Sequence, residues 1–229
     1  QVVDWQKGNH PDNEMRKTVA ITCDDGSWFD FYDLEHPTWG MQRSMINILL
    51  DHNSRYGPAH PAHATSFVIS SPDARSSLDK SCMIGKDWWG DQWWVKAAAS
   101  GIMDIACHSW DHVHPNLDSV AQQDQIRGDF SQIDSFTDCE IQFAKAGEYI
   151  AGVLGGKRPA LFAYPYGSFS TYASDEYLPG HQSSHQFTAA FTTEPKAVSK
   201  TDSVWLLPRY VCGQDWKSPD DLGKILRDI

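Results

Sequence analysis

Short apolar runs alternate with segments of helical periodicity along this chain. The apolar runs predict four strands and two shorter ones: Thr18–Thr22, Ala64–Ser70, Ile102–Cys107, Ala160–Tyr164, Ala189–Thr193 and Val204–Leu207. Helical spacing predicts three helical regions: Met41–His52, Asp91–Ala99 and most of Asp118–Leu154, with a break near Asp134–Thr137. Strand followed by helix, repeated, predicts parallel strands joined by crossover helices, and therefore an α/β fold.

Residues suited to catalysis follow two of the predicted strands directly. Asp24 and Asp25 come after the first strand, in the sequence Thr-Cys-Asp-Asp-Gly, and His108 and His112 come after the third, in His-Ser-Trp-Asp-His. In α/β barrels the loops at the carboxyl ends of the strands build the active site. We therefore expect both motifs to face one site.

One carboxylate and two imidazoles can hold a divalent metal ion and leave positions open for water or substrate. Neighbouring residues on an extended segment point to opposite sides, so the two carboxylates can take different roles. Alone, the acidic pair is also typical of a polar turn and the histidine pair of an exposed loop. Their coincidence predicts a metal site, and the donor set favours zinc, with cobalt, nickel and manganese left open.

Length, net charge and the distribution of apolar residues and cysteines limit the classes of protein to which the chain can belong. The 229 residues suffice for one sizeable core, and the net charge of −11 argues against a nucleic-acid partner. No apolar run is long enough to cross a membrane, and no signal peptide is visible. Cys23 and Cys107 lie in apolar runs and are predicted to be buried thiols, whereas a disulfide between Cys82 and Cys139 is left open.

Ten tryptophans are the unusual feature of the composition. Indole rings fill cores, and sugars also stack on them. Trp28 follows Asp25 in a loop, and Trp110 lies inside the histidine motif. Trp88 and Trp89 lie in a loop before the third strand, so these four are candidate walls of a sugar groove. Trp93 and Trp94 begin a predicted helix, and we expect them to pack in the core.

The two motifs, followed by Phe-Ala-Tyr-Pro-Tyr-Gly at 162–167, resemble the motifs of the polysaccharide deacetylases, the carbohydrate esterase family four type. The resemblance covers roughly Lys17 to Tyr210. It implies a distorted (β/α) barrel with about seven parallel strands, with residues 1–229 as a single catalytic domain. It also implies roles for individual residues. Asp25, His108 and His112 would bind the metal, and Asp24 would be the base that takes a proton from the metal-activated water. The backbone N–H of Tyr166 would face the oxyanion, and Pro165 and Tyr166 would shape one wall.

The chain departs from the family pattern in two places. Ala163 stands where many members have an arginine, and Arg209 is the candidate replacement that would hold Asp24 through a charge-assisted pair, although a surface arginine fits the sequence equally well. The late histidine that protonates the leaving group is not evident. His181 and His185 lie in a loop that could reach the substrate or be solvated, and the general acid is left open.

The resulting hypothesis is a metal-dependent hydrolase that removes N- or O-acetyl groups from a carbohydrate. Family analogy suggests a secreted, periplasmic or cell-surface protein. Two alternatives remain at this stage. One is an amidohydrolase that acts on a small non-sugar amide, and the other is a non-catalytic carbohydrate-binding domain on the same fold. The glycan and the oligomeric state are not specified by the sequence.

Overall fold

Five parallel strands form the central sheet in the computed structural model, which describes residues 2–9, 18–118 and 127–228. The strand order is β1-β4-β5-β6-β7, and every neighbouring pair runs parallel. The strands are β1 (Ile21–Cys23), β4 (Ala64–Val68), β5 (Met103–Cys107), β6 (Leu161–Ala163) and β7 (Ala189–Phe191). The sheet curls into half a barrel, which confirms the predicted α/β fold of the distorted-barrel type.

The predicted number of strands is higher than the number that the sheet contains in the described residues. The segment Val204–Leu207 forms no strand there. Only Leu207 pairs with the sheet, through an isolated parallel bridge to Phe191 of β7. The chain thus adds a single bridge beyond β7 and no further strand. In the described residues the sheet has five strands, so the predicted total of about seven is only partly reached.

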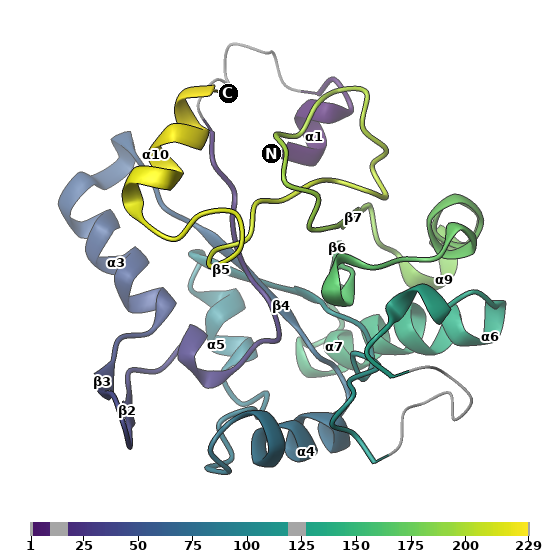
Figure 1. The fold of residues 1–229 in the computed structure, drawn as a ribbon, viewed down its shortest axis with the longest axis horizontal. Helices are drawn as coiled ribbons and strands as arrows, with labels where there is room; N and C mark the ends of the chain where they lie inside the picture. Colours follow the sequence, from purple (N-terminus) through teal and green to yellow (C-terminus); the bar gives the residue numbers. More distant parts are fainter. Residues whose placement is uncertain (1, 10–17, 119–126, 229) are drawn as a thin grey trace.

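Helices flank the sheet, with α3 and α10 on one side of the molecule and α6 and α9 on the other (Figure 1). The helices are α1 (Val2–Gln6), α3 (Met45–Tyr56), α4 (Pro72–Cys82), α5 (Trp94–Ala99), α6 (Phe136–Cys139), α7 (Ala146–Val153), α8 (Leu178–Gly180), α9 (Gln182–His185) and α10 (Pro219–Asp228). Two π-helical stretches, Glu140–Lys145 and Tyr172–Tyr177, join α6 to α7 and precede α8. Short 3-10 helices cover Trp28–Asp30, Gly57–Ala59, Phe130–Gln132 and Pro165–Gly167.

The first long helix begins four residues later than its apolar spacing predicts. Gly40–Gln42 is strand β3, which pairs antiparallel with β2 (Leu34–His36). Ser44 then caps α3, because its hydroxyl accepts a hydrogen bond from the backbone N–H of Asn47. Pairing in the hairpin and this cap set the start of the helix at Met45.

Helix α4 is absent from the pattern-based prediction. Its sequence is mostly polar, and only Ala74 and Leu78 of its apolar residues are buried. The local signals are its ends: Ser71 is the N-cap and accepts from the backbone N–H of Ala74, and Pro72 occupies the first turn. Farther along, the helical region predicted from Asp118 begins at Phe136 in the described residues, and its part within 119–126 lies outside them.

The first strand is less buried than predicted, because β1 is an edge strand of the sheet. Ile21 is exposed and Cys23 is half-buried, whereas Cys107 in the central strand β5 is fully buried. Cys82 and Cys139 are free thiols: Cys82 is exposed, and Cys139 lies in the core.

The core between the sheet and its helices is strongly aromatic. Trp93 and Trp94 are fully buried, as expected, and Phe143, Phe162 and Tyr177 pack together on the side of α6 and α7. No helix among the described residues is long and apolar enough to span a bilayer.

Candidate active site

The carboxyl ends of the strands bring the predicted motifs together. Asp24 and Asp25 directly follow β1, and His108 directly follows β5, which is separated from β1 by β4 alone. Tyr166 is the third residue after the end of β6, following Tyr164 and Pro165. Because the strands are parallel, these segments meet at one edge of the sheet, as the barrel geometry predicts.

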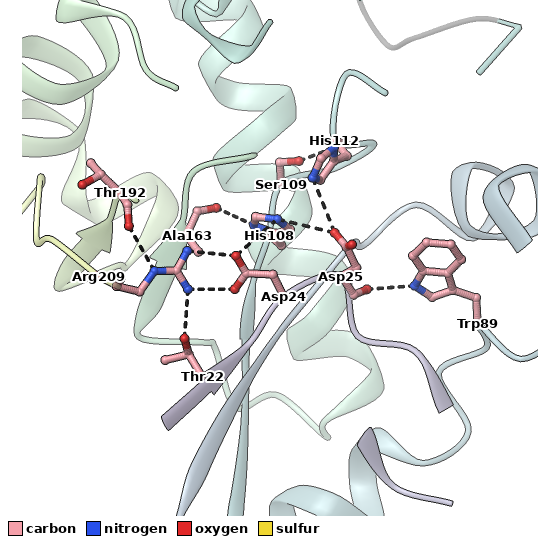
Figure 2. Close-up of polar contacts among 10 residues, drawn as sticks. All are labelled: Thr22, Asp24, Asp25, Trp89, His108, Ser109, His112, Ala163, Thr192 and Arg209. Atoms are coloured by element: carbon pink, nitrogen blue, oxygen red, sulfur yellow. Dashed lines mark hydrogen bonds and ion pairs between the residues drawn. The ribbon is translucent and has the colours of Figure 1, made fainter. Parts of the chain in front are cut away.

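Asp25, His108 and His112 converge on one point (Figure 2). The Nε2 atoms of His108 and His112 lie 3.6 and 3.5 Å from the same oxygen, Oδ1 of Asp25. Their three ligand atoms all lie within 4.8 Å of one another. Nitrogen and oxygen ligands at 2.0–2.2 Å from a tetrahedral zinc ion are about 3.3–3.6 Å apart, so the spacing fits such an ion.

The protonation chemistry of the two histidines also fits a cation. Nδ1 of His108 lies 2.8 Å from the carbonyl oxygen of Ala163, so this nitrogen carries the proton and leaves the Nε2 lone pair facing Asp25. Burial lowers the pKa of His112 well below its ordinary value, which keeps this imidazole neutral. Burial, reinforced by the charge of Asp24, raises the pKa of Asp25. A divalent cation would stabilise the charged form of the Asp25 carboxylate, which burial disfavours.

Asp24 is held apart from this group by Arg209. The guanidinium donates to both carboxylate oxygens, at 2.8 and 2.9 Å, and also to Oγ1 of Thr22 and the carbonyl of Thr192. Burial alone would raise the pKa of Asp24, but His108 and Arg209 outweigh it and hold the pKa below its usual value. Asp24 is therefore an ionised carboxylate at neutral pH, 4.0 Å from Nε2 of His108.

Backbone strain is concentrated in the loops of the site. Seven non-glycine residues of the described chain have positive φ, and five of them belong to these loops: Asp25, Ser109, His112, Val113 and Tyr166. A left-handed conformation costs on the order of 1–3 kcal/mol at such residues. The surrounding structure must hold them in place, and it does so with direct hydrogen bonds such as the one from the N–H of His112 to Oγ of Ser109 at 2.9 Å.

The site contains a cavity of about 330 Å³. Its walls include the two aspartates and the two histidines, together with Ile69, Cys82, Trp89, His114, Tyr166, Gly167 and Thr193. Tyr166 is 43% exposed, and its ring packs edge-on against His112 with ring centroids 4.5 Å apart. Pro165, which precedes it, is buried and begins the short 3-10 turn that contains Tyr166.

Of the two neighbouring tryptophans predicted to form a wall, Trp89 lines the cavity and Trp88 does not belong to its described lining. The Trp89 indole N–H donates to the carbonyl oxygen of Asp25 at 2.9 Å. Trp88 packs edge-on against Phe29 and lies under the amino group of Lys86. A loop without regular periodicity gives no sequence signal for which of two adjacent rings points inward.

Trp28 and Trp110 lie beside the cavity and are partly buried, without belonging to its described lining. The indole N–H of Trp28 donates to the carbonyl of Gly90, which ties the loop after Asp25 to the loop of Trp89. Trp110 packs against Tyr149 and carries the ammonium of Lys145 over its ring, 3.8 Å from the centroid. Trp28 thus joins two loops near the site, and Trp110 packs the histidine loop against Lys145 and Tyr149.

The two late histidines are not brought to this cavity in the described structure. His185 is fully buried: its Nε2 donates to the carbonyl of Leu178, and its Nδ1 accepts from the backbone N–H of Phe187. His181 stacks on Tyr177 and contacts Phe136. The interpretation of His185 as a substrate-binding residue is therefore corrected, because both ring nitrogens serve a helix end and a turn in the core.

A family model described as polysaccharide deacetylase matches residues 12–178. The chain belongs to the polysaccharide deacetylase family, as its motifs indicated. Among functionally curated protein sequences, none is significantly similar to it.

Solved structures with the same fold include proteins of this family. A de-N-acetylase from Aggregatibacter actinomycetemcomitans is 18% identical, with a TM-score of 0.58 over 98% of this chain and 80% of that one. IcaB from Ammonifex degensii is 18% identical, with a TM-score of 0.58 over 91% of this chain and 71% of that one. A Bacillus anthracis protein described as a polysaccharide deacetylase is 14% identical, with a TM-score of 0.58 over 90% of this chain. This chain spans about half of its length, 51%. At these identities the likeness concerns the fold.

Proposed function

We propose that this protein is a metal-dependent hydrolase that removes acetyl groups from a carbohydrate. One observation carries the proposal: Asp25, His108 and His112 converge within 4.8 Å, while Asp24 stands beside them in a separate ion pair with Arg209. Ligands and base are thus distinct groups in one cavity. Membership of the polysaccharide deacetylase family supports the substrate class.

Asp25 and the two histidines would hold a divalent ion, and the nitrogen-rich donor set favours zinc. When bound, such an ion lowers the pKa of a coordinated water from 15.7 towards about 7 and polarises a carbonyl oxygen. The hydrogen bond between His108 and Ala163 orients one ligand, and the turn from Ser109 to His112 orients the other. Partners of this kind fix the direction of the ligand lone pairs.

Asp24 acts as the general base. Its carboxylate is ionised at neutral pH, and Arg209 keeps it from turning towards the metal ligands. As the water oxygen bonds to the acetyl carbon, Asp24 takes the proton that the water loses. The bond between that carbon and the sugar nitrogen or oxygen then breaks, and Asp24 returns the proton to the leaving group. Acetate and a free amine or hydroxyl result.

Tyr166 contributes through its backbone and its ring. Its φ of 61° turns the peptide at the cavity, and we assign its N–H to the negative charge that develops on the acetyl oxygen. A donor in this role contributes about 3–4 kcal/mol to the transition state. The exposed ring of Tyr166, which follows Pro165, and Trp89 on the other wall offer apolar surface to a sugar.

Acetate release tests the proposal. Purified protein with zinc should release acetate from acetylated oligosaccharides, such as fragments of chitin, peptidoglycan, poly-N-acetylglucosamine or acetylated xylan. A chelator should abolish the release, and added zinc should restore it. Simple acetamides and short acetylated peptides serve as controls for the non-sugar alternative. Sugar binding without acetate release at saturating metal would overturn the catalytic assignment and favour a binding domain.

A further inference from the structure

The backbone of Asp25 is an unusual place for a metal ligand. Asp25 and Gly26 both have a φ of 73°, and a Cβ atom at Gly26 would lie 2.4 Å from Cγ1 of Val68. The turn is therefore pressed against strand β4 in a conformation that an aspartate rarely adopts. Its direction determines where the Asp25 carboxylate points.

Two hydrogen bonds hold the peptide of Asp25 in this turn. Its carbonyl oxygen accepts the backbone N–H of Ile69 at 3.3 Å and the indole N–H of Trp89 at 2.9 Å. The first bond comes from the segment that follows β4. The second is the shorter of the two, and it comes from a side chain that lines the cavity and is 7% exposed. Figure 2 shows the indole directed at this carbonyl, on the side of Asp25 opposite His108.

Trp89 is itself anchored by a buried arginine. Arg75 of helix α4 is 3% exposed, and its Nη1 donates to the carbonyl oxygen of Trp89 at 3.0 Å. Its Nη2 donates to Asp91 at 2.8 Å and to the hydroxyl of Tyr149 at 3.2 Å. Tyr149 closes the group by donating to Asp91 at 2.6 Å. A charged network thus holds the carbonyl of Trp89 and the side chain of Asp91 two residues farther along.

We propose that Trp89 is a positioning residue for the metal site: its indole N–H fixes the peptide of Asp25 and so sets the affinity for the metal. The inference rests on the proposed metal site. Groups that orient a ligand change metal affinity by about 10–100-fold. Here the orienting group acts on the backbone of the ligand, because the left-handed turn couples the carbonyl to the direction of the side chain.

Two substitutions separate the hydrogen bond from the packing. Trp89→Phe keeps an apolar ring and removes the donor. Trp89→His removes the larger part of the ring, but its Nε2 takes the position of the indole nitrogen and restores an N–H donor. Packing alone predicts that the phenylalanine variant resembles wild type more closely in every property. The positioning role predicts the opposite order for metal affinity.

The measurement is zinc binding to the apoprotein, by calorimetry or by competition with a chromophoric chelator, alongside the urea unfolding midpoint of each apoprotein. We expect Trp89→Phe to weaken zinc binding at least tenfold while Trp89→His weakens it less, although the histidine variant is the less stable. Trp88→Phe and Trp88→His are the matched controls, and both should bind zinc as wild type does.

Equal zinc affinity in wild type and Trp89→Phe would overturn the positioning role and leave the proposed function intact. Absence of zinc binding in wild type would overturn both. If the Trp89 variants do not fold, Arg75→Lys tests the same path with the indole in place. It should weaken zinc binding several-fold in the folded protein, and unchanged affinity there would count against the proposal.

Discussion

Arg209 and Asp24 are separated by 185 residues in the sequence and meet in a two-pronged ion pair, with N–O distances of 2.8 and 2.9 Å. The contact joins the segment beyond β7 to the end of β1. Paired N–H···O bonds of this kind fix geometry as well as charge. The pair therefore keeps the Asp24 carboxylate ionised and bound to Arg209, beside the group formed by Asp25, His108 and His112.

Replacing Arg209 should change the pH dependence of the reaction. Without the guanidinium, burial raises the pKa of Asp24, and a base works only above its pKa. Arg209→Met should therefore move the acidic limb of kcat/KM to higher pH. Arg209→Lys keeps a positive charge but cannot make both hydrogen bonds to the carboxylate, and it should move the acidic limb less. An unshifted profile for Arg209→Met would argue against Asp24 as the titrating base.

Asp24 and Asp25 should respond differently to the same substitution. Asp24→Asn removes the base and should lower kcat by about 10²–10⁴-fold, with zinc affinity nearly unchanged. Asp25→Asn removes a ligand and should abolish tight zinc binding. Steady-state kinetics and zinc calorimetry on both variants test the division of roles. Full activity of Asp24→Asn would refute its role as base.

Metal removal should also lower stability. A ligand at 100 times its dissociation constant stabilises the folded state by about 2.7 kcal/mol, which raises the melting temperature of a chain of this size by roughly 5–10 °C. Zinc added to the chelated protein should produce this increase. His112→Ala should melt at the same temperature with and without zinc. A similar zinc effect on that variant would place the binding site elsewhere.

Asp30 predicts a pH dependence of stability that is separate from catalysis. Asp30 is 8% exposed and accepts the hydroxyl of Ser66 at 2.6 Å, and burial raises its pKa to about 7. Between pH 4 and 7 the folded state holds a proton that the unfolded state has lost, so stability falls as the pH rises. The loss is about 1.4 kcal/mol per unit of pKa difference, up to about 4 kcal/mol.

Asp30→Asn carries no titrating proton at this position. Relative to wild type, the variant should gain stability as the pH rises from 4.5 to 7.5, as measured by urea unfolding at both pH values. Parallel curves for the two proteins would show that the Asp30 carboxyl does not carry the effect.

Two glycines with the same backbone conformation should differ sharply in their tolerance of a methyl group. Gly167 and Gly155 both have a φ of 68°. A Cβ at Gly167 would lie 2.0 Å from Oγ1 and 2.8 Å from the backbone nitrogen of Thr193, whereas Gly155 has open space. Gly155→Ala should cost about 1 kcal/mol of backbone strain. Gly167→Ala should cost about 1–3 kcal/mol more, and urea unfolding that gives equal costs would contradict this.

The sequence predicted the parts of the site that depend on strand ends. Apolar runs located β1 and β5, and the polar residues after them had to meet because parallel strands end at one edge. The contact of Arg209 with Asp24, one of the two alternatives that the sequence left open for this arginine, is present. The catalytic and metal-binding roles of these residues remain predictions.

Features that depend on tertiary packing could not be predicted from the hydrophobic periodicity of the sequence. Helix α4 is polar along most of its length, so no apolar periodicity indicated the helix or the buried position of Arg75 within it. Trp89 rather than Trp88 lines the cavity, and its carbonyl is bound by Arg75 in a network that forms only when α4 and α7 pack together. The sequence around His185 is typical of a loop, yet in the fold its ring packs among aromatic rings.

The strained turns at Asp25, His112 and Tyr166 have a consequence for protein engineering. Residues outside the loops help to hold them: Ile69 and Trp89 donate to the carbonyl of Asp25, and Gln142 accepts the N–H of Trp110 in the histidine loop. Copying the loops alone onto another α/β sheet would therefore transfer the side chains without these supports. A successful transplant would need the supporting positions as well, such as Trp89 for the first turn. The smallest part of the protein that can be transplanted is therefore the loops together with the neighbouring segments that support them.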